Sequence, residues 1–107
     1  MKLGISIWSQ GATWGSLRET AQLVDRLGYD HLWTFDHLLP NLGDPEAPVH
    51  EGWLTLATWA EATKRPHLGL MVGANTFRNP ALVAKMAVTL DHASGGRAML
   101  GLGSAWF

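Results

Sequence analysis

The sequence predicts an α/β fold in which four parallel strands alternate with helices. Short apolar segments of strand length alternate along the chain with longer segments whose apolar residues recur at helical spacing. Glycine, proline and asparagine residues punctuate the boundaries between these segments. Because a strand, a helix and a second parallel strand form a right-handed crossover, this repeated order predicts one parallel sheet covered by helices.

The first part of the chain contains a strand, a helix and a second strand. Residues 2–8 alternate apolar and polar side chains, which is typical of a half-buried strand. Ser16 and Glu19 match the S-x-x-E capping box and predict the start of a helix, and Gly28 is placed for its left-handed C-cap. The predicted apolar face of this helix consists of Leu17, Ala21, Val24 and Leu27. A second strand follows at about residues 31–35.

The middle of the chain resumes helical spacing after a loop rich in proline and glycine. Residues 51–64 form the predicted second helix, which Pro66 stops. Its expected apolar positions are Trp53, Leu56, Ala57 and Ala60. Residues 67–74 are almost continuously apolar, as expected for a strand buried on both faces.

The last part of the chain contains a third helix and a fourth strand. Asn79 and Pro80 fit the N-cap and first position of a helix. Its expected apolar positions are Leu82, Val83, Met86, Ala87 and Leu90. The helix ends at residues 94–96, and residues 97–103 form the fourth strand.

Two architectures accommodate this order, a small doubly wound sheet and a section of a (β/α)₈ barrel. The sequence ends directly after a strand, on Trp106 and Phe107, without a helix to cover that strand's outer face. A complete barrel takes about 250 residues, so 107 residues correspond to about four βα units. We therefore expect residues 1–107 to be a single partial domain, the N-terminal half of a barrel, and a fragment.

Composition excludes several classes of protein. With 47% hydrophobic residues, 16% charged residues and a formal net charge of −1, the chain is typical of a soluble globular domain. The charge is too small and too dispersed for nucleic acid to be the main partner, and no apolar run reaches the roughly 20 residues of a membrane span. The absence of cysteine fits a cytoplasmic location.

A polar pair, Asp36 and His37, directly follows the second predicted strand. In a (β/α)₈ barrel the catalytic groups lie at the C-terminal ends of strands, so this pair is the first candidate for an active site. An imidazole suits general-base catalysis because it ordinarily titrates near neutral pH. The alternative is that Asp36 caps the following loop and His37 is an ordinary surface residue.

No metal site is expected. The chain has five histidines, but none is paired at i,i+3 or i,i+4 on a helix and none has a cysteine companion. These residues are His31, His37, His50, His67 and His92.

Three segments together resemble a known family. These segments are KLGISIW, LVDRLGYDHLWTFDHLLP and NTFRNPALVAKMAVTLDHASGGRAMLGLGSAWF, and they cover nearly the whole chain. The chain resembles the N-terminal half of the luciferase-like monooxygenase superfamily, especially the branch that uses the deazaflavin coenzyme F420. The resemblance implies a TIM barrel that binds the ring of F420, or alternatively of FMN, across the C-terminal ends of its strands. It further implies hydride transfer between that ring and a small organic substrate.

The resemblance also implies roles for individual residues. His37 matches the active-site histidine near the ring carbon that exchanges hydride, and Asp36 would orient it or bind the cofactor. The other implied cofactor-binding residues are Gly73, Ala74, Asn75, Thr76 and Gly103, with a non-prolyl cis peptide at about Gly73–Ala74. The implied substrate pocket contains Trp8, Ser104 and Trp106. The alternative for residues 73–79 is a plain turn between strand and helix, capped by Asn79.

Other functions stay open at the level of sequence. An FMN-dependent monooxygenase of the same family is one alternative, and a non-catalytic truncated half-barrel is another. A sugar isomerase or epimerase can share the opening KLGIS…LGYDHLW, but it would usually carry a glutamate at the end of the second strand. A dinucleotide-binding loop is excluded because Trp106 stands where G-x-G-x-x-G requires glycine. We expect unpaired barrel edges to promote homo-oligomers.

Overall fold

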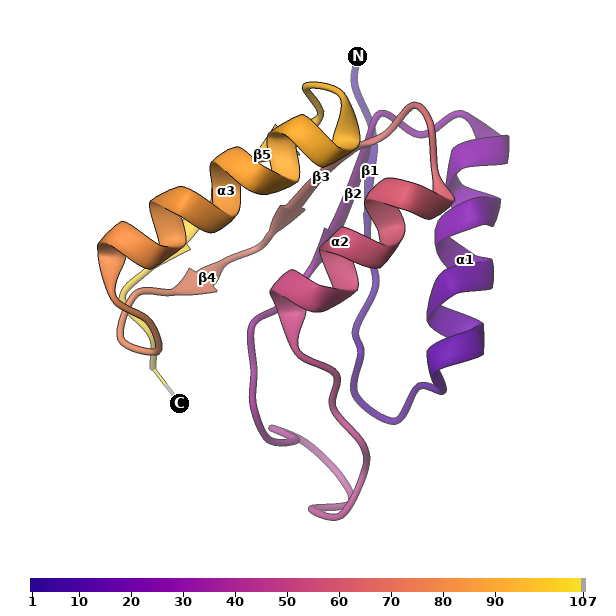
Figure 1. Cartoon of the computed structure of the whole chain (residues 1–107). Coiled ribbons are helices and arrows are strands. Elements are labelled where there is room, and N and C mark those ends of the chain that lie inside the picture. Colours follow the sequence, from indigo (N-terminus) through magenta and orange to yellow (C-terminus); the bar gives the residue numbers. More distant parts are fainter. Residues whose placement is uncertain (107) are drawn as a thin grey trace.

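The strands of the protein form one parallel sheet and a small parallel extension of it. The computed structural model describes residues 1–106. The main sheet has the order β1-β2-β3-β5, and β4 pairs with β6 in a second sheet. The strands are β1 (Gly4–Ser6), β2 (His31–Thr34), β3 (His67–Leu70), β4 (Gly73–Ala74), β5 (Ala98–Met99) and β6 (Leu102–Gly103). The helices are α1 (Trp14–Leu27), α2 (Gly52–Ala62) and α3 (Pro80–Ser94) (Figure 1).

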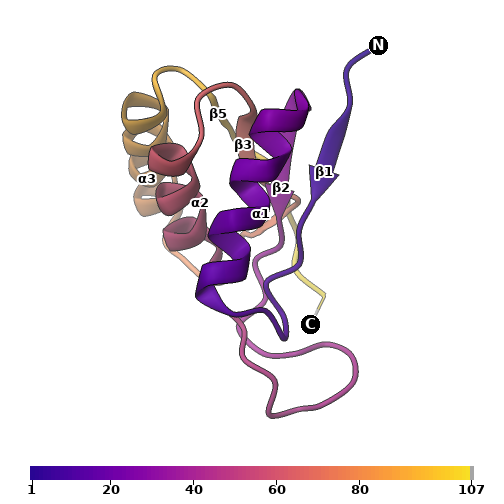
Figure 2. The ribbon, with the colours of Figure 1, turned by 90° about the vertical axis from the view of Figure 1, so that its right-hand side faces the viewer.

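All three helices cover the same face of the main sheet. Figure 2 shows the three helices together on one side of the strands. Strands that follow one another in sequence are also neighbours in the sheet, so every right-handed crossover places its helix on the same face. A doubly wound sheet would carry helices on both faces. The arrangement is therefore that of a section of a barrel wall, as the sequence predicts.

The core lies between this helical layer and the sheet. Trp59 of α2 is its largest fully buried side chain, and Leu32, Leu68 and Leu70 of the strands pack in the same cluster as the helices. Three positions predicted to be apolar contacts are exposed, because they lie at the margin of each helix's buried stripe: Leu27, Ala57 and Leu82. None of the helices within residues 1–106 is both long enough and apolar enough to cross a membrane.

The ends of the helices follow the sequence with one exception. Asn79 caps α3 ahead of Pro80, and Gly28 ends α1 in the left-handed conformation at φ 86°, as predicted. The predicted capping box at Ser16 is wrong, because α1 begins three residues earlier. Its N-cap is Thr13, whose hydroxyl accepts the backbone N–H of Ser16 at 3.1 Å. The helix begins nearly one turn earlier because Thr13 caps it in the way predicted for Ser16, by accepting the N–H three residues on.

The third and fourth predicted strands are each interrupted. Residues 67–74 form β3 and β4, separated by a cis peptide bond between Met71 and Val72. The cis bond implied by the resemblance is thus present, but two residues before the expected position. Residues 97–103 likewise divide into β5 and β6. Both breaks occur at the C-terminal end of the sheet, where the chain turns to build the cavity described next.

Candidate active site

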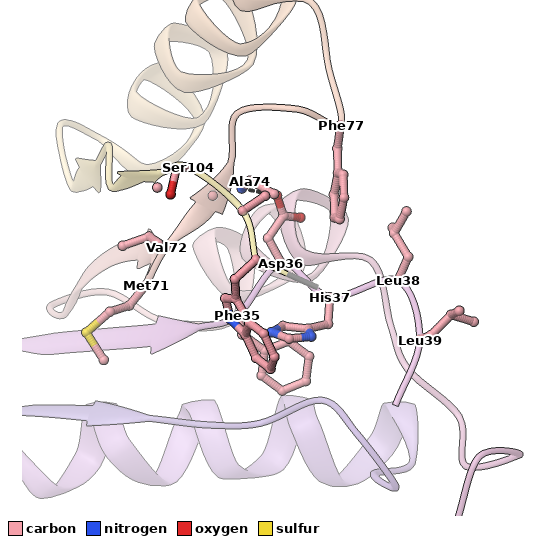
Figure 3. Close-up of a pocket in the computed structure, with 14 residues that line it drawn as sticks. Phe35, Asp36, His37, Leu38, Leu39, Met71, Val72, Ala74, Phe77 and Ser104 are labelled. Atoms are coloured by element: carbon pink, nitrogen blue, oxygen red, sulfur yellow. Dashed lines mark hydrogen bonds between the residues drawn. The ribbon is translucent and has the colours of Figure 1, made fainter. Parts of the chain in front are cut away.

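A cavity of about 520 Å³ opens at the C-terminal ends of the parallel strands. This volume lies within the range of about 300–1,000 Å³ that is usual for small-molecule sites. Residues after β2, after β3 and after β6 form its walls, so three βα units contribute (Figure 3). Its lining residues are Phe35, Asp36, His37, Leu38, Leu39, Met71, Val72, Gly73, Ala74, Phe77, Gly103, Ser104, Ala105 and Trp106.

The cavity brings together most of the residues that the sequence singled out. Asp36, His37, Gly73, Ala74, Gly103, Ser104 and Trp106 all line it. Trp8, Asn75 and Thr76 do not belong to the lining. Trp8 instead packs edge-to-face on Phe35, with ring centroids 5.6 Å apart, and thus supports a lining residue from behind.

Several apolar lining residues were missed at the level of sequence. Phe35, Leu38 and Leu39 flank the Asp-His pair, Met71 and Val72 carry the cis bond, and Phe77 and Ala105 complete the wall. A signal for Phe35 existed, because it is the last apolar residue of the second predicted strand.

His37 lies among aromatic rings. Its imidazole meets Phe35 edge-on, with ring centroids 5.0 Å apart, and Trp106 with centroids 5.9 Å apart. Figure 3 shows Phe35 and His37 together, with Ser104 and Val72 across the cavity. Aromatic pairs prefer edge-to-face arrangements of this kind, which favour one orientation of the ring. The imidazole is therefore held in a defined orientation beside the cavity.

Asp36 is buried, with 3% of its surface exposed, and its carboxylate is fully engaged by neighbouring donors. Arg78 donates to both oxygens, Nη1 to Oδ2 at 2.6 Å and Nη2 to Oδ1 at 2.8 Å. The backbone N–H of Ala74 donates to Oδ2 at 2.9 Å. These bonds join the end of β2 to the loop that follows β3, and they show a structural use of the carboxylate. A contact of Asp36 with the cofactor remains a prediction.

Arg78 also pairs with Glu51, which sequence reasoning missed. Its Nη2 donates to the Glu51 carboxylate, whose other oxygen caps α2 by accepting the backbone N–H of Leu54 at 2.7 Å. Hydrogen bonding to Asp36 raises the pKa of Arg78, and Glu51 adds to this effect while burial opposes it. The guanidinium stays charged throughout the physiological range. The sequence offers no local signal for this pairing, because Arg78 lies 42 residues from Asp36 and 27 from Glu51 along the chain.

The glycines of this region allow strands to approach closely. Gly73 donates its N–H to Gly101 O at 2.9 Å, and Asn75 donates to Gly103 O at 3.1 Å. A Cβ at Gly101 would overlap the carbonyl oxygen of Leu70, and one at Gly103 would overlap Val72. Both glycines are therefore required by strand packing, whether or not they also contact a ring.

The cavity suits the ring of a flavin or deazaflavin and does not suit its anionic tail. Its walls combine apolar side chains with small residues at Gly73, Ala74 and Gly103, which admit a flat ring. Among the residues that line it within the described chain, none is a lysine or arginine that could hold a phosphate. Within residues 1–106 no group of three or more His, Cys, Asp and Glu side chains is arranged to hold a metal ion.

Comparison with known proteins gives one family over the whole chain. The profile of the luciferase-like monooxygenase family matches residues 1–107. The 4-hydroxyprotoasukamycin monooxygenase of Streptomyces nodosus subsp. asukaensis is 37% identical over 94% of this chain and 24% of its own length. An F420-dependent glucose-6-phosphate dehydrogenase of Amycolatopsis mediterranei is 39% identical over 82% of this chain and 26% of its own length.

A solved structure extends the similarity to three dimensions. An F420-dependent secondary alcohol dehydrogenase, in complex with an F420-acetone adduct, superposes with a TM-score of 0.84 at 26% identity. The match covers 98% of this chain and 32% of that enzyme. The chain thus spans about a quarter of the length of the curated relatives and about a third of the solved structure, and it corresponds to part of a TIM barrel.

Proposed function

This chain belongs to the luciferase-like monooxygenase family, and from that premise we propose that it supplies the ring-binding part of an F420-dependent oxidoreductase. The proposed reaction is hydride transfer between the deazaflavin and a small organic substrate. Relatives and a structural neighbour named as F420-dependent support this choice of cofactor. A sugar isomerase or epimerase is disfavoured by the family match.

One observation carries the proposal. The Asp36-His37 pair lies at the C-terminal end of β2, in a cavity that three βα units build together at the catalytic rim of the barrel. Phe35 and Trp106 contact the half-buried imidazole of His37, which supports a role for it beside the cavity.

His37 would accept the proton of a substrate hydroxyl, or return it in the reverse direction. The bound deazaflavin would accept or supply the hydride, which is the chemistry of the cofactor itself. Phe35 and Trp106 would hold the imidazole beside the reacting atoms. Ser104, at the opposite wall, would contact the substrate.

The site is incomplete within this chain. Positions 104–106 are Ser, Ala and Trp, and none of these three side chains is a carboxylate that could act as a second acid or base. The anionic tail of the cofactor also needs basic groups that the cavity lacks. We propose that further βα units of a complete barrel provide both.

A second candidate is an FMN-dependent monooxygenase. The Streptomyces nodosus relative is named as a monooxygenase, and flavins support oxygen chemistry. The same apolar cavity would accept either ring. Comparative binding of F420 and FMN distinguishes the two candidates.

The test is a titration of the 107-residue chain with F420 and with FMN, following ring fluorescence. Ala74→Leu places a larger side chain in the cavity, and Ala81→Leu makes the same change at an exposed position of α3 outside it. We expect saturable binding. Ala74→Leu should weaken it by about 5- to 150-fold, because overpacking costs about 1–3 kcal/mol, whereas Ala81→Leu should leave it unchanged. Equal binding by both variants, or binding of neither ring, would overturn the proposal.

A further inference from the structure

We infer that Arg78 is a positioning residue that holds the start and the end of the β2–α2 loop together and thereby fixes the wall of the cavity. For the identity of the ligand that this wall contacts, the inference rests on the proposed function. Arg78 itself does not line the cavity, so it would act only through other residues.

The two ends of the loop meet at one guanidinium. Asp36 stands at the beginning of the segment 36–51 and Glu51 at its end, and Arg78 binds both carboxylates. Between these ends the loop extends beyond the helices and the sheet, at the bottom of Figure 1. The side chain of Arg78 is 13% exposed and that of Asp36 is 1% exposed, so solvent screens their pairing little.

Asp36 connects Arg78 to the wall of the cavity. The carboxylate that Arg78 holds also accepts the N–H of Ala74, whose residue forms part of the wall. His37 is the next residue along the chain and lines the same cavity. A shift of Asp36 would therefore move both Ala74 and the backbone that carries His37.

The surroundings of Asp36 are shaped to this arrangement. A Cβ at Gly52 would lie 2.9 Å from the carbonyl oxygen of Phe35 and 3.3 Å from Asp36 Oδ1. The first residue of α2 must therefore be glycine for Glu51 to come near Asp36. Arginine suits position 78 because its planar guanidinium can bind two carboxylates at once, which a lysine ammonium cannot do with the same geometry.

The middle of the loop is held by other contacts, and this provides an internal control. Asn41 donates its backbone N–H to Gln10 Oε1 at 3.1 Å, and Ser9 donates its hydroxyl to the carbonyl oxygen of His50 at 3.1 Å. These contacts involve the segment after β1 and not Arg78. Removal of Arg78 should loosen Ala74 and leave the amide of Asn41 protected.

The experiment measures amide hydrogen exchange by NMR in the 107-residue chain and in its Arg78→Gln variant. We expect exchange at Ala74 to accelerate by roughly ten- to hundredfold, because this is the effect of losing one hydrogen bond to a charged acceptor. Exchange at Asn41 should stay within about twofold of its rate in the parent chain. The double variant Asp36→Asn with Arg78→Gln removes both charges, and it should recover part of the protection at Ala74. Arg78→Lys, which keeps the charge and loses the fork, should give an intermediate acceleration and serves where Arg78→Gln does not fold.

Unchanged exchange at Ala74 in Arg78→Gln and Arg78→Lys would overturn the inference. Equal acceleration at Ala74 and Asn41 would also overturn it, because the effect of Arg78 would then not be specific to the wall of the cavity. Titration of the same samples with F420 and FMN separates the two proposals. Local loosening at Ala74 in a chain that binds neither ring supports the role of Arg78 and contradicts the proposed function. Ring binding by the parent chain, with unchanged exchange at Ala74 in the variants, supports the proposed function and contradicts the role of Arg78.

Discussion

Replacing Arg78 by alanine should destabilise the protein far more than replacing Arg65, although both arginines form an ion pair with an aspartate. The Arg78 and Asp36 side chains are 13% and 1% exposed, whereas the Arg65 side chain is 60% exposed and that of its partner Asp25 is 17% exposed. Removing one partner of a buried pair leaves an uncompensated charge and costs about 3–5 kcal/mol. Removing an exposed partner costs about 0–1 kcal/mol.

These values predict a clear separation in urea. With an m value of about 2 kcal/mol per M, Arg78→Ala should lower the unfolding midpoint by about 1.5–2.5 M, and Arg65→Ala by about 0.5 M or less. Tryptophan fluorescence reports the transition, since Trp53 and Trp59 are 6% and 1% exposed. Midpoints for the two variants that lie within about 0.3 M of each other would refute the reasoning that Asp36 depends on Arg78.

Three further predictions test the barrel wall, the histidine and the open edges. Gly69→Ala should lower the free energy of unfolding, measured in urea, by about 1–3 kcal/mol, because its Cβ would lie 2.6 Å from both the Met99 carbonyl oxygen and the Trp33 ring. A decrease below about 0.5 kcal/mol would show that β3 and β5 are not packed as described. His37→Ala in a complete enzyme that contains this segment should lower the hydride-transfer rate by about 10²–10⁴-fold with an unchanged circular dichroism spectrum, and normal turnover would remove His37 from the mechanism. The chain should self-associate through the free edges of β1 and β5, and sedimentation of a stable monomer at all concentrations would contradict this.

The helices were predictable from sequence because their signals are local. Asn79 followed by Pro80, and Gly28 after an amphipathic segment, each act within one turn of the chain. Even the error at Ser16 is local, since Thr13 offers the same kind of hydroxyl three residues earlier and yields a longer helix. The relative order of the elements then determined the parallel sheet.

The interruptions of the strands could not be predicted in the same way. The breaks after Leu70 and Met99 depend on how Gly73 meets Gly101 and how Asn75 meets Gly103 across the sheet. No property of residues 67–74 taken alone distinguishes a continuous strand from an interrupted one. The cis bond between Met71 and Val72 was accordingly misplaced by two residues.

The candidate site was predictable where it depends on strand ends. Asp36, Gly73 and Gly103 each follow or end a strand, and parallel strands place such residues at one rim. The pairing of Arg78 with both Asp36 and Glu51 was not predictable, since it joins the two ends of the β2–α2 loop to the segment just before α3. Trp8 illustrates the same limit: its strand end was correctly placed, but only the packing shows that it supports Phe35 from outside the lining.

The most direct test of the account is to observe where a bound ring lies. Intermolecular NOEs should be measured between F420 or FMN and the chain labelled with ¹³C. We expect contacts from ring protons to His37 and to the Ala74 methyl group, and none to Trp33 or His31 on the uncovered face of the sheet. Contacts confined to Trp33 and His31, or none to His37, would contradict it.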